Sequence, residues 1–196
     1  MSESGIPIKD VTHLREALGL LGSLMDTTHD ELEIAVVGGS ALLLEGSVSR
    51  VTRDVDVVAF VTGEDLRRES PGSDLLESRV LAVGLELGLE PAWLNLGPVS
   101  LLDAGLPEGF LARCGIETFG GLRVHFAGRY DLIHMKLFAA ADQGPTSKHM
   151  SDLLALGPTS DELDAAREWC RTQDVSMPFS SEVDATVAWV KRETNE

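Results

Sequence analysis

The chain is short of cysteine and of long hydrophobic runs. It has two cysteines, Cys114 and Cys170, and two thiols so far apart predict neither a disulfide framework nor a zinc site. No hydrophobic run approaches the roughly 20 residues that a membrane-spanning helix needs. The first ten residues, MSESGIPIKD, lack the basic and then apolar layout of a signal peptide. We therefore expect a cytoplasmic protein with reduced thiols and no membrane partner.

Positive charge is also scarce, because 16 lysines and arginines face 32 acidic residues, for a net charge of −16. A protein that binds RNA usually has a basic surface patch, since contacts with the phosphates dominate its affinity for RNA. The acidity counts against an RNA substrate, although it allows a local basic groove.

What the chain does have is the composition of a folded domain. Apolar residues make up 43% of its 196 residues and charged residues 24%, as in soluble globular proteins. That length suits one domain, or one domain with a small helical appendix.

The stretch from Ile34 to Phe60 organises the rest of the chain. A hydrophobic strand stops at a glycine turn, Gly38-Gly39-Ser40, and a short helix follows over 41–44. A polar connector then leads to a second, β-branched strand that carries Asp54 and Asp56 at its start. The pattern predicts a strand, a turn, a helix and a second strand.

Asp54 and Asp56 predict a cation site. Side chains on a strand alternate between its faces, so both carboxylates point the same way. Adjacent carboxylates raise each other's pKa unless something neutralises them. Mg²⁺ (or Mn²⁺) does so, taking one or two protein carboxylates together with phosphate oxygens of a substrate. Glycines allow a ligand close to the backbone, and a helix N-terminus offers N–H groups to phosphate. The alternative is a βαβ core segment with two exposed turn aspartates.

This pattern resembles the nucleotidyltransferase superfamily of the polymerase-β type. The family signature is a Gly-Gly/Ser pair followed, after a gap, by acid-hydrophobic-acid-hydrophobic, here Gly39-Ser40 and 54–57 (DVDV). The longer string GGSALLLEGSVSRVTRDVDVV is similar to AbiEii-type bacterial proteins, some of which are toxins of toxin–antitoxin pairs. The resemblance implies an α/β (α+β) fold with a small mixed sheet flanked by helices. It also implies a metal on Asp54 and Asp56 and triphosphate contacts from Gly38, Gly39 and Ser40.

Three residues of the connector are candidate nucleotide contacts. Arg50 and Arg53 flank the acid pair, where they would bind phosphate or merely balance its charge. Thr52 lies two residues before Asp54, on the same expected strand face, and would touch the nucleotide.

Helices and a hairpin are expected around this core. Apolar residues spaced by three and four predict a helix over 8–25, and another from about Asp74 to Leu87 with Leu75 and Leu81 on its apolar side. Gly120-Gly121 predicts a two-residue hairpin turn. The other elements expected before residue 129 are a strand and loop at 91–98, an irregular apolar loop at 101–106, and strands at 116–119 and 122–126.

One departure from the family concerns a later strand. Polymerase-β-type enzymes commonly carry a third carboxylate there, whereas this chain offers Arg123 and His125. This puts a simple site of three carboxylates and two metals in doubt. Arg123 and His125 would touch a phosphate, or would sit on the solvent face of an edge strand.

The chain is expected to be helical from residue 129 onward. The block KLFAAADQGPTSKHMSDLLAL is similar to the paired helices of the AbiEii-like group, in which a lysine and an aspartate face the nucleotide. That implies a triphosphate contact from Lys136, a nucleotide contact from Lys148, and Asp152 as base or orienter. The alternatives are a snorkelling Lys136 and a surface Asp152 paired with Lys148. The helices are expected at 130–141, at 147–156, from a Ser160 cap to residue 170, and at 183–191.

The expected organisation is an α/β core at 1–128 and a helical part at 129–196 that packs on it and completes the site. The function implied by the resemblance is Mg²⁺-dependent transfer of a nucleoside monophosphate from an NTP, with the protein acting as a toxin on tRNA and restrained by a cognate antitoxin. The alternatives are a small-molecule acceptor, such as an antibiotic, and a domain that binds nucleotide or protein without catalysis.

Overall fold

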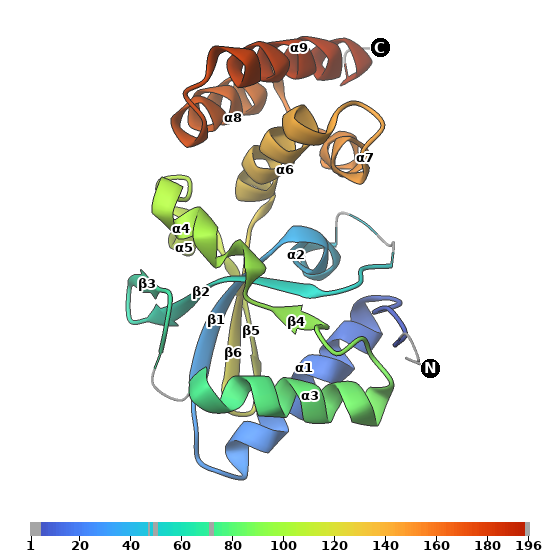
Figure 1. Cartoon of the computed structure of the whole chain (residues 1–196), viewed down its shortest axis with the longest axis vertical. Helices are drawn as coiled ribbons and strands as arrows, with labels where there is room; N and C mark the ends of the chain where they lie inside the picture. The colour runs from blue at the N-terminus through green and yellow to red at the C-terminus, as the bar shows by residue number, and fades with distance from the viewer. Residues whose placement is uncertain (1–4, 47, 49–50, 71–72, 195–196) are drawn as a thin grey trace. The chain divides into compact units, whose positions relative to one another are not determined.

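The computed structural model describes residues 5–46, 48, 51–70 and 73–194. The chain forms two compact units (Figure 1). Unit 1 consists of Met1–Asp103 and Leu111–Ala127, and unit 2 of Ala104–Phe110 and Gly128–Glu196. The division expected from the sequence lies at 128/129 and leaves the short segment 104–110 in the core. The packing of the helical part on the core remains a prediction.

Unit 1 is built on a mixed sheet, as the fold class expected from the sequence requires. In the described residues the sheet has six strands in the order β3-β2-β1-β6-β5, with β4 beside β2. Among the named strands of the described residues, β1 with β6 and β2 with β4 run parallel, and the other pairs are antiparallel. The strand bounds are β1 Leu32–Val37, β2 Val55–Thr62, β3 Asp65–Arg67, β4 Leu94–Asn95, β5 Gly115–Phe119 and β6 Leu122–Phe126.

The pairing of β1 with β2 contains a β-bulge. Ala35 pairs with Ala59, but the next residue, Val36, pairs with Val57, so Val58 is an extra residue on β2. A bulge of this kind bends the strand and changes the direction of its side chains. The extra residue, Val58, lies two positions after Asp56.

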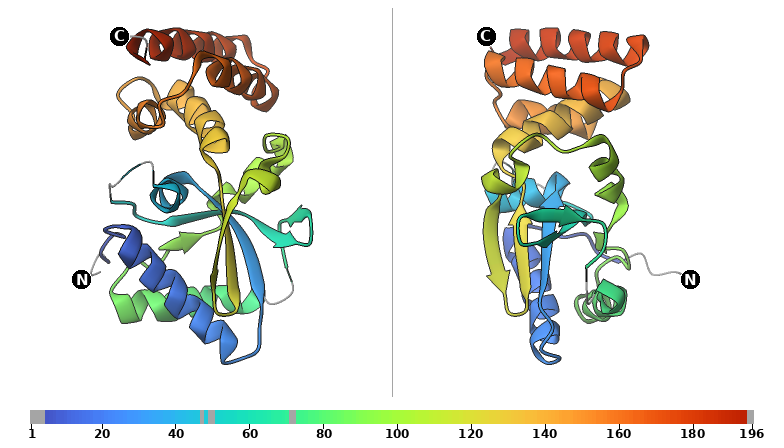
Figure 2. Two further views of the ribbon diagram at one scale, coloured as in Figure 1. Left: turned by 180° about the vertical axis from the view of Figure 1, so that it is seen from behind. Right: turned by 90° about the vertical axis from the view of Figure 1, so that its left-hand side faces the viewer.

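Two helices cover one face of the sheet (Figure 2). Helix α1 (Val11–Asp26) packs on β5, β6 and α3, and α3 spans Leu76–Leu87. Helix α1 begins at Val11 rather than at residue 8, because Ile8 forms a β-bridge with Thr52 and the Asp10 side chain caps the first turn. The short helix α2 (Gly38–Glu45) packs on β1 and β2 and begins at the glycines themselves.

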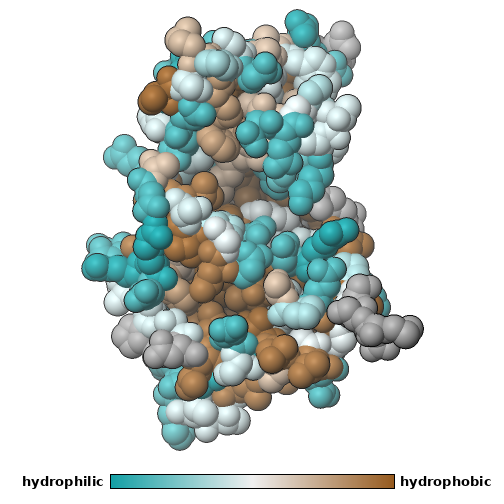
Figure 3. Space-filling view, viewed as in Figure 1, coloured by the Kyte–Doolittle hydropathy of each residue, from teal (hydrophilic) through white to brown (hydrophobic). Residues whose placement is uncertain are grey.

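Two expectations for the segment around α3 are wrong. Leu75 and Leu81 are 50% and 48% exposed, because the buried side of α3 is formed by Leu76, Val80 and Val83. The expected loop at 101–106 instead begins with helix α4 (Leu101–Ala104). Hydrophobic surface is seen in the region of α3 and β4 (Figures 1 and 3).

The hairpin expected at Gly120-Gly121 is confirmed, since β5 and β6 pair from Phe119–Leu122 outward. The turn of this hairpin packs closely against α1 and the residues that follow it. A side chain at Gly121 would meet the Asp30 carbonyl oxygen at 2.4 Å, and Gly22 of α1 lies against the backbone of Phe119. The turn therefore fits under α1 only because both segments carry glycine.

Unit 2 is helical. Its helix cap differs from the expected one: Thr159, rather than Ser160, closes a capping box with Glu162. The last helix is also longer than expected. The helix bounds are α6 Arg129–Gln143, α7 Lys148–Ala155, α8 Ser160–Gln173 and α9 Met177–Thr194. The four-residue α5 spans Phe110–Arg113, of which the last three residues belong to unit 1. None of the helices in the described part of the chain has the length and apolar character that crossing a bilayer requires.

Candidate active site

The acid pair lies where three strands of unit 1 meet. Asp56 on β2 is in register with Val37, the last residue of β1, and with Asn95 on β4. Asp54 lies just before β2, and both aspartates are partly exposed. The two carboxylates therefore lie side by side, as the two-residue spacing predicts.

The glycine turn lies directly against one of the carboxylates. Gly38 has a φ of +73°, which favours glycine. A Cβ atom at this position would lie 2.3 Å from Asp56 Oδ2. Residue 38 thus allows the start of α2 to approach the acid pair, and the first N–H groups of that helix lack partners within it.

Asn95 is a member of this site that the sequence analysis missed. Its side-chain amide donates to Asp54 Oδ2 and to Asp56 Oδ1, both at 3.3 Å. Its own oxygen accepts from the Gly97 N–H at 2.9 Å. The available signal was a polar residue at the end of the short buried strand WLN, but nothing local connects it with residue 56.

These residues line an open pocket in unit 1, which we call the acid pocket, with a volume of about 690 Å³. The lining residues are Arg53, Asp54, Asp56, Glu90, Ala92, Asn95, Gly97, Pro98, Ser100 and Leu101. Three of them are acidic and one is basic, so the pocket suits a cation better than a bare anion.

The residues present fit a hard divalent cation. Two adjacent carboxylates are the protein share of many Mg²⁺ sites, which are completed by water and by substrate phosphates. Within the described residues no group of three His, Cys, Asp or Glu side chains is placed to hold a metal. Ligands beyond Asp54 and Asp56 would therefore come from a bound substrate and water.

The other candidates around the acid pair differ in their surroundings. Arg53 is exposed and lines the acid pocket, whereas Arg50 lies outside the described residues. The Ser40 side chain is fully buried, and its hydroxyl donates to the Val37 carbonyl at 3.2 Å. Thr52 precedes β2 rather than lying on it; it is buried, its N–H donates to Ile8 and its hydroxyl to the Asp54 carbonyl.

A comparison with protein families gives a match that includes these residues. The family described as "Nucleotidyltransferase of unknown function (DUF6036)" matches residues 13–154. The chain belongs to this nucleotidyltransferase family. No curated protein and no solved structure matches the chain significantly. The match supports the superfamily inferred from the glycine turn and the acid pair, while the narrower likeness to AbiEii-type proteins remains a prediction.

For a nucleotidyltransferase, the acid missing from the later strand is not replaced by Glu33, the acid that contacts that strand. Glu33 on β1 pairs with Arg123 at 3.0 Å and with His125 Nε2 at 2.8 Å. His125 is buried and so is not on a solvent face, whereas Arg123 is exposed. Glu33 is four residues from Val37, the partner of Asp56, which is about 13 Å along the strand. That is too far for a shared metal.

The nucleotidyltransferase match also includes Lys136 and Asp152, which the structure brings together within unit 2. Lys136 Nζ lies 2.7 Å from Asp152 Oδ2, and their side chains are 5% and 2% exposed. Asp152 is thus neither a surface acid nor a partner of the exposed Lys148, and Lys136 does not snorkel. The pair links α6 to α7, the two helices expected to carry it.

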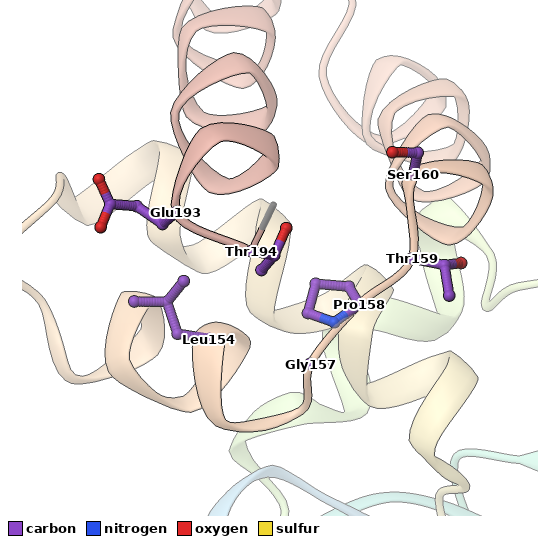
Figure 4. Close-up of a pocket in the computed structure, with 7 residues that line it drawn as sticks. All are labelled: Leu154, Gly157, Pro158, Thr159, Ser160, Glu193 and Thr194. Atoms are coloured by element: carbon purple, nitrogen blue, oxygen red, sulfur yellow. The ribbon is translucent and has the colours of Figure 1, made fainter. Parts of the chain in front are cut away.

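A second pocket lies wholly within unit 2 (Figure 4). The α7–α8 loop with Gly157 and Pro158 forms one wall, and Glu193 and Thr194 of α9 lie across from it. Its one carboxylate is Glu193, and the Thr159 hydroxyl is already used in the capping box. The acid pocket therefore remains the better candidate for nucleotidyl chemistry.

Proposed function

We propose that the protein transfers a nucleoside monophosphate from an NTP to a nucleophilic group of an acceptor, such as a hydroxyl, and releases pyrophosphate, with Mg²⁺ or Mn²⁺ bound to Asp54 and Asp56. The observation that carries the proposal is the contact of the Gly38 turn with the Asp56 carboxylate. It places a phosphate-seating backbone beside a cation-binding pair. The cation would neutralise the triphosphate and the charge that develops during transfer.

Each part of the site has a distinct role in this proposal. The carboxylates of Asp54 and Asp56 hold the cation, and the backbone N–H groups of Gly39 and Ser40 bind the β- and γ-phosphates at the start of α2. The backbone is the better donor here because the Ser40 hydroxyl already bonds to Val37. Arg53, which is exposed at the pocket, would bind an outer phosphate.

The proposal also covers the residues of unit 2. Lys136 would supply charge to the triphosphate, Lys148 would contact the nucleotide, and Asp152 would orient the acceptor or accept its proton. Because Lys136 and Asp152 are bonded to each other, either role requires the two residues to act as a pair or to separate when the nucleotide binds.

The acceptor that we propose first is tRNA, with the protein acting as a toxin that a cognate antitoxin restrains. The support is the likeness of the long glycine–aspartate string to toxin-associated proteins.

A small-molecule acceptor is the second candidate, and two observations favour it. Glu90 adds a third carboxylate to the acid pocket, and an adjoining apolar groove shares Ala92 and Asn95 with that pocket. Such surroundings repel a polyanion and suit a neutral or cationic molecule.

The test is label transfer from each of the four α-³²P NTPs, with Mg²⁺, into total tRNA and into a panel of aminoglycosides. Wild type is compared with Asp56→Ala. Labelled tRNA with wild type only would support the first acceptor, and a labelled small molecule would support the second. If calorimetry detects nucleotide binding but no acceptor is labelled, the remaining alternative is a binding domain without catalysis.

A further inference from the structure

We propose that Asn95 is a positioning residue of the metal site, which fixes the orientation of the two carboxylates that would bind the cation. The inference rests on the metal role proposed above for Asp54 and Asp56. It assigns a function to a residue outside the glycine turn and the acid motif.

The orientation of the Asn95 amide is fixed by its neighbours. The oxygen accepts the Gly97 N–H at 2.9 Å, which leaves the NH₂ group facing the acid pair. A reversed amide would place its NH₂ against a backbone donor and its oxygen against two carboxylates, and would lose all three hydrogen bonds. The side chain therefore presents two donors to the site and no acceptor.

These donors bond one defined oxygen of each carboxylate. In Asp56, Oδ1 receives the Asn95 bond, while Oδ2 lies on the side of the Gly38 turn. In Asp54, Oδ2 is the oxygen that faces Asn95. One oxygen of each carboxylate is thus held by the amide, and the Asp56 oxygen opposite it is directed to the place where we propose that the phosphates bind.

A neutral amide suits this task better than a charged group. A lysine or arginine here would neutralise the pair and compete with the cation, whereas a further acid would add to the repulsion between the carboxylates. Asparagine compensates part of the negative charge and leaves the site attractive to a divalent ion. Residues that orient metal ligands in this way typically change metal affinity 10- to 100-fold when they are replaced.

The experiment is a Mn²⁺ titration of the nucleotide-free full chain, followed by the electron paramagnetic resonance signal of free Mn²⁺. Wild type is compared with Asn95→Leu, which keeps the volume, and with Asn95→Ala. Ser100→Ala, a truncation at the same pocket, is the matched control. We expect both Asn95 variants to bind Mn²⁺ about 10- to 100-fold more weakly, and Ser100→Ala to bind it like wild type.

Thermal melting without metal separates positioning from a general loss of structure. An unchanged melting temperature of Asn95→Leu together with weaker Mn²⁺ binding supports the proposal. Mn²⁺ affinity equal to wild type in both Asn95 variants overturns it and leaves the proposed function intact. A wild-type protein that binds no Mn²⁺ overturns the metal site itself and this inference with it.

Discussion

The two pairs of ionisable residues on which the proposed chemistry depends have opposite surroundings. In unit 1, Asp54 and Asp56 are like charges, partly exposed and joined through the amide of Asn95. In unit 2, Lys136 and Asp152 are opposite charges, 2.7 Å apart and almost fully buried. The first pair consists of like charges that a bound cation can bridge, and the second is compensated by its own opposite charges.

This difference separates what each pair can do without rearrangement. A pair that repels itself in an open pocket gains free energy from a bound cation, which is typical of functional sites. A buried pair of opposite charges fixes how two helices meet. Removing one member destabilises the fold, because the other charge remains buried without this partner. Unit 1 therefore has the clearer binding site, and unit 2 has the more sensitive structural pair.

The largest expected effect is on catalysis in unit 1. Replacing Asp56 by asparagine should lower the rate of nucleotide incorporation roughly 10³-fold, because metal assistance supplies several kcal/mol of charge stabilisation. The melting temperature without metal should stay close to that of wild type, since asparagine keeps the volume of a side chain that is partly exposed. If Asp56→Asn loses activity only because it unfolds, the pair in unit 1 is structural and the contrast with unit 2 is wrong.

The next effect is on the stability of unit 2. Lys136→Met should lower its free energy of unfolding by about 3–5 kcal/mol, because Asp152 would remain buried without this partner. The double variant Lys136→Met/Asp152→Leu should recover much of that loss, as measured by urea denaturation. A double variant that is stable but inactive would show that the pair also takes part in catalysis, whereas full activity would make it structural only.

A partly exposed pair in unit 2 should contribute less and should depend on pH. The hydrogen bond from Arg129 lowers the pKa of Glu162 below its usual value of 4.5, against the opposite effect of burial. Stability from this carboxylate is thus fully present above pH 4.5 and is lost as the pH falls through the lowered value.

Glu162→Gln keeps an acceptor for the Thr159 N–H but removes the charge. We expect it to cost about 1 kcal/mol at pH 7, with the difference from wild type shrinking in denaturant titrations below pH 4.5. A difference that stays constant with pH would show that the charge of Glu162 contributes nothing.

The smallest effect concerns Cys170, whose thiol should react very slowly with an alkylating reagent in the native state. Burial raises the pKa of the Cys170 thiol to about 12, so little thiolate exists at pH 8. In a Cys114→Ala background, iodoacetamide should label Cys170 only as fast as unit 2 opens. Labelling should be faster in Lys136→Met and unchanged in Asp56→Asn, as mass spectrometry would show. Rapid labelling of the Cys114→Ala protein would contradict the buried position.

The features that could be predicted are those set by short-range pattern. Two-residue spacing put Asp54 and Asp56 together, and the Gly120-Gly121 pair located the hairpin. The start of α1 was misplaced because Ile8 pairs with Thr52, 44 residues further along the chain, and this bridge takes precedence over a continuous helical pattern.

The missed features depend on contacts between distant strands. Asn95 reaches the acid pair only because β4 lies parallel to the start of β2. Glu33 meets His125 only because β1 and β6 are parallel neighbours. The exposure of Leu81 follows from which side of α3 packs inward, and periodicity alone fixes the spacing of a face but not its width.

The extra residue in β2 has a consequence for the whole site. Val55, Val57 and Phe60 all belong to one hydrophobic core. Val57 and Phe60 are three positions apart, and on a regular strand such residues would point to opposite faces. If Val58 were instead paired in a regular ladder without the bulge, strict alternation from Phe60 would carry the side chains at positions 58, 56 and 54 to that core, aspartates included. The bulge thus sets the parity of the strand and keeps its two acids on the side away from the protein's own interior.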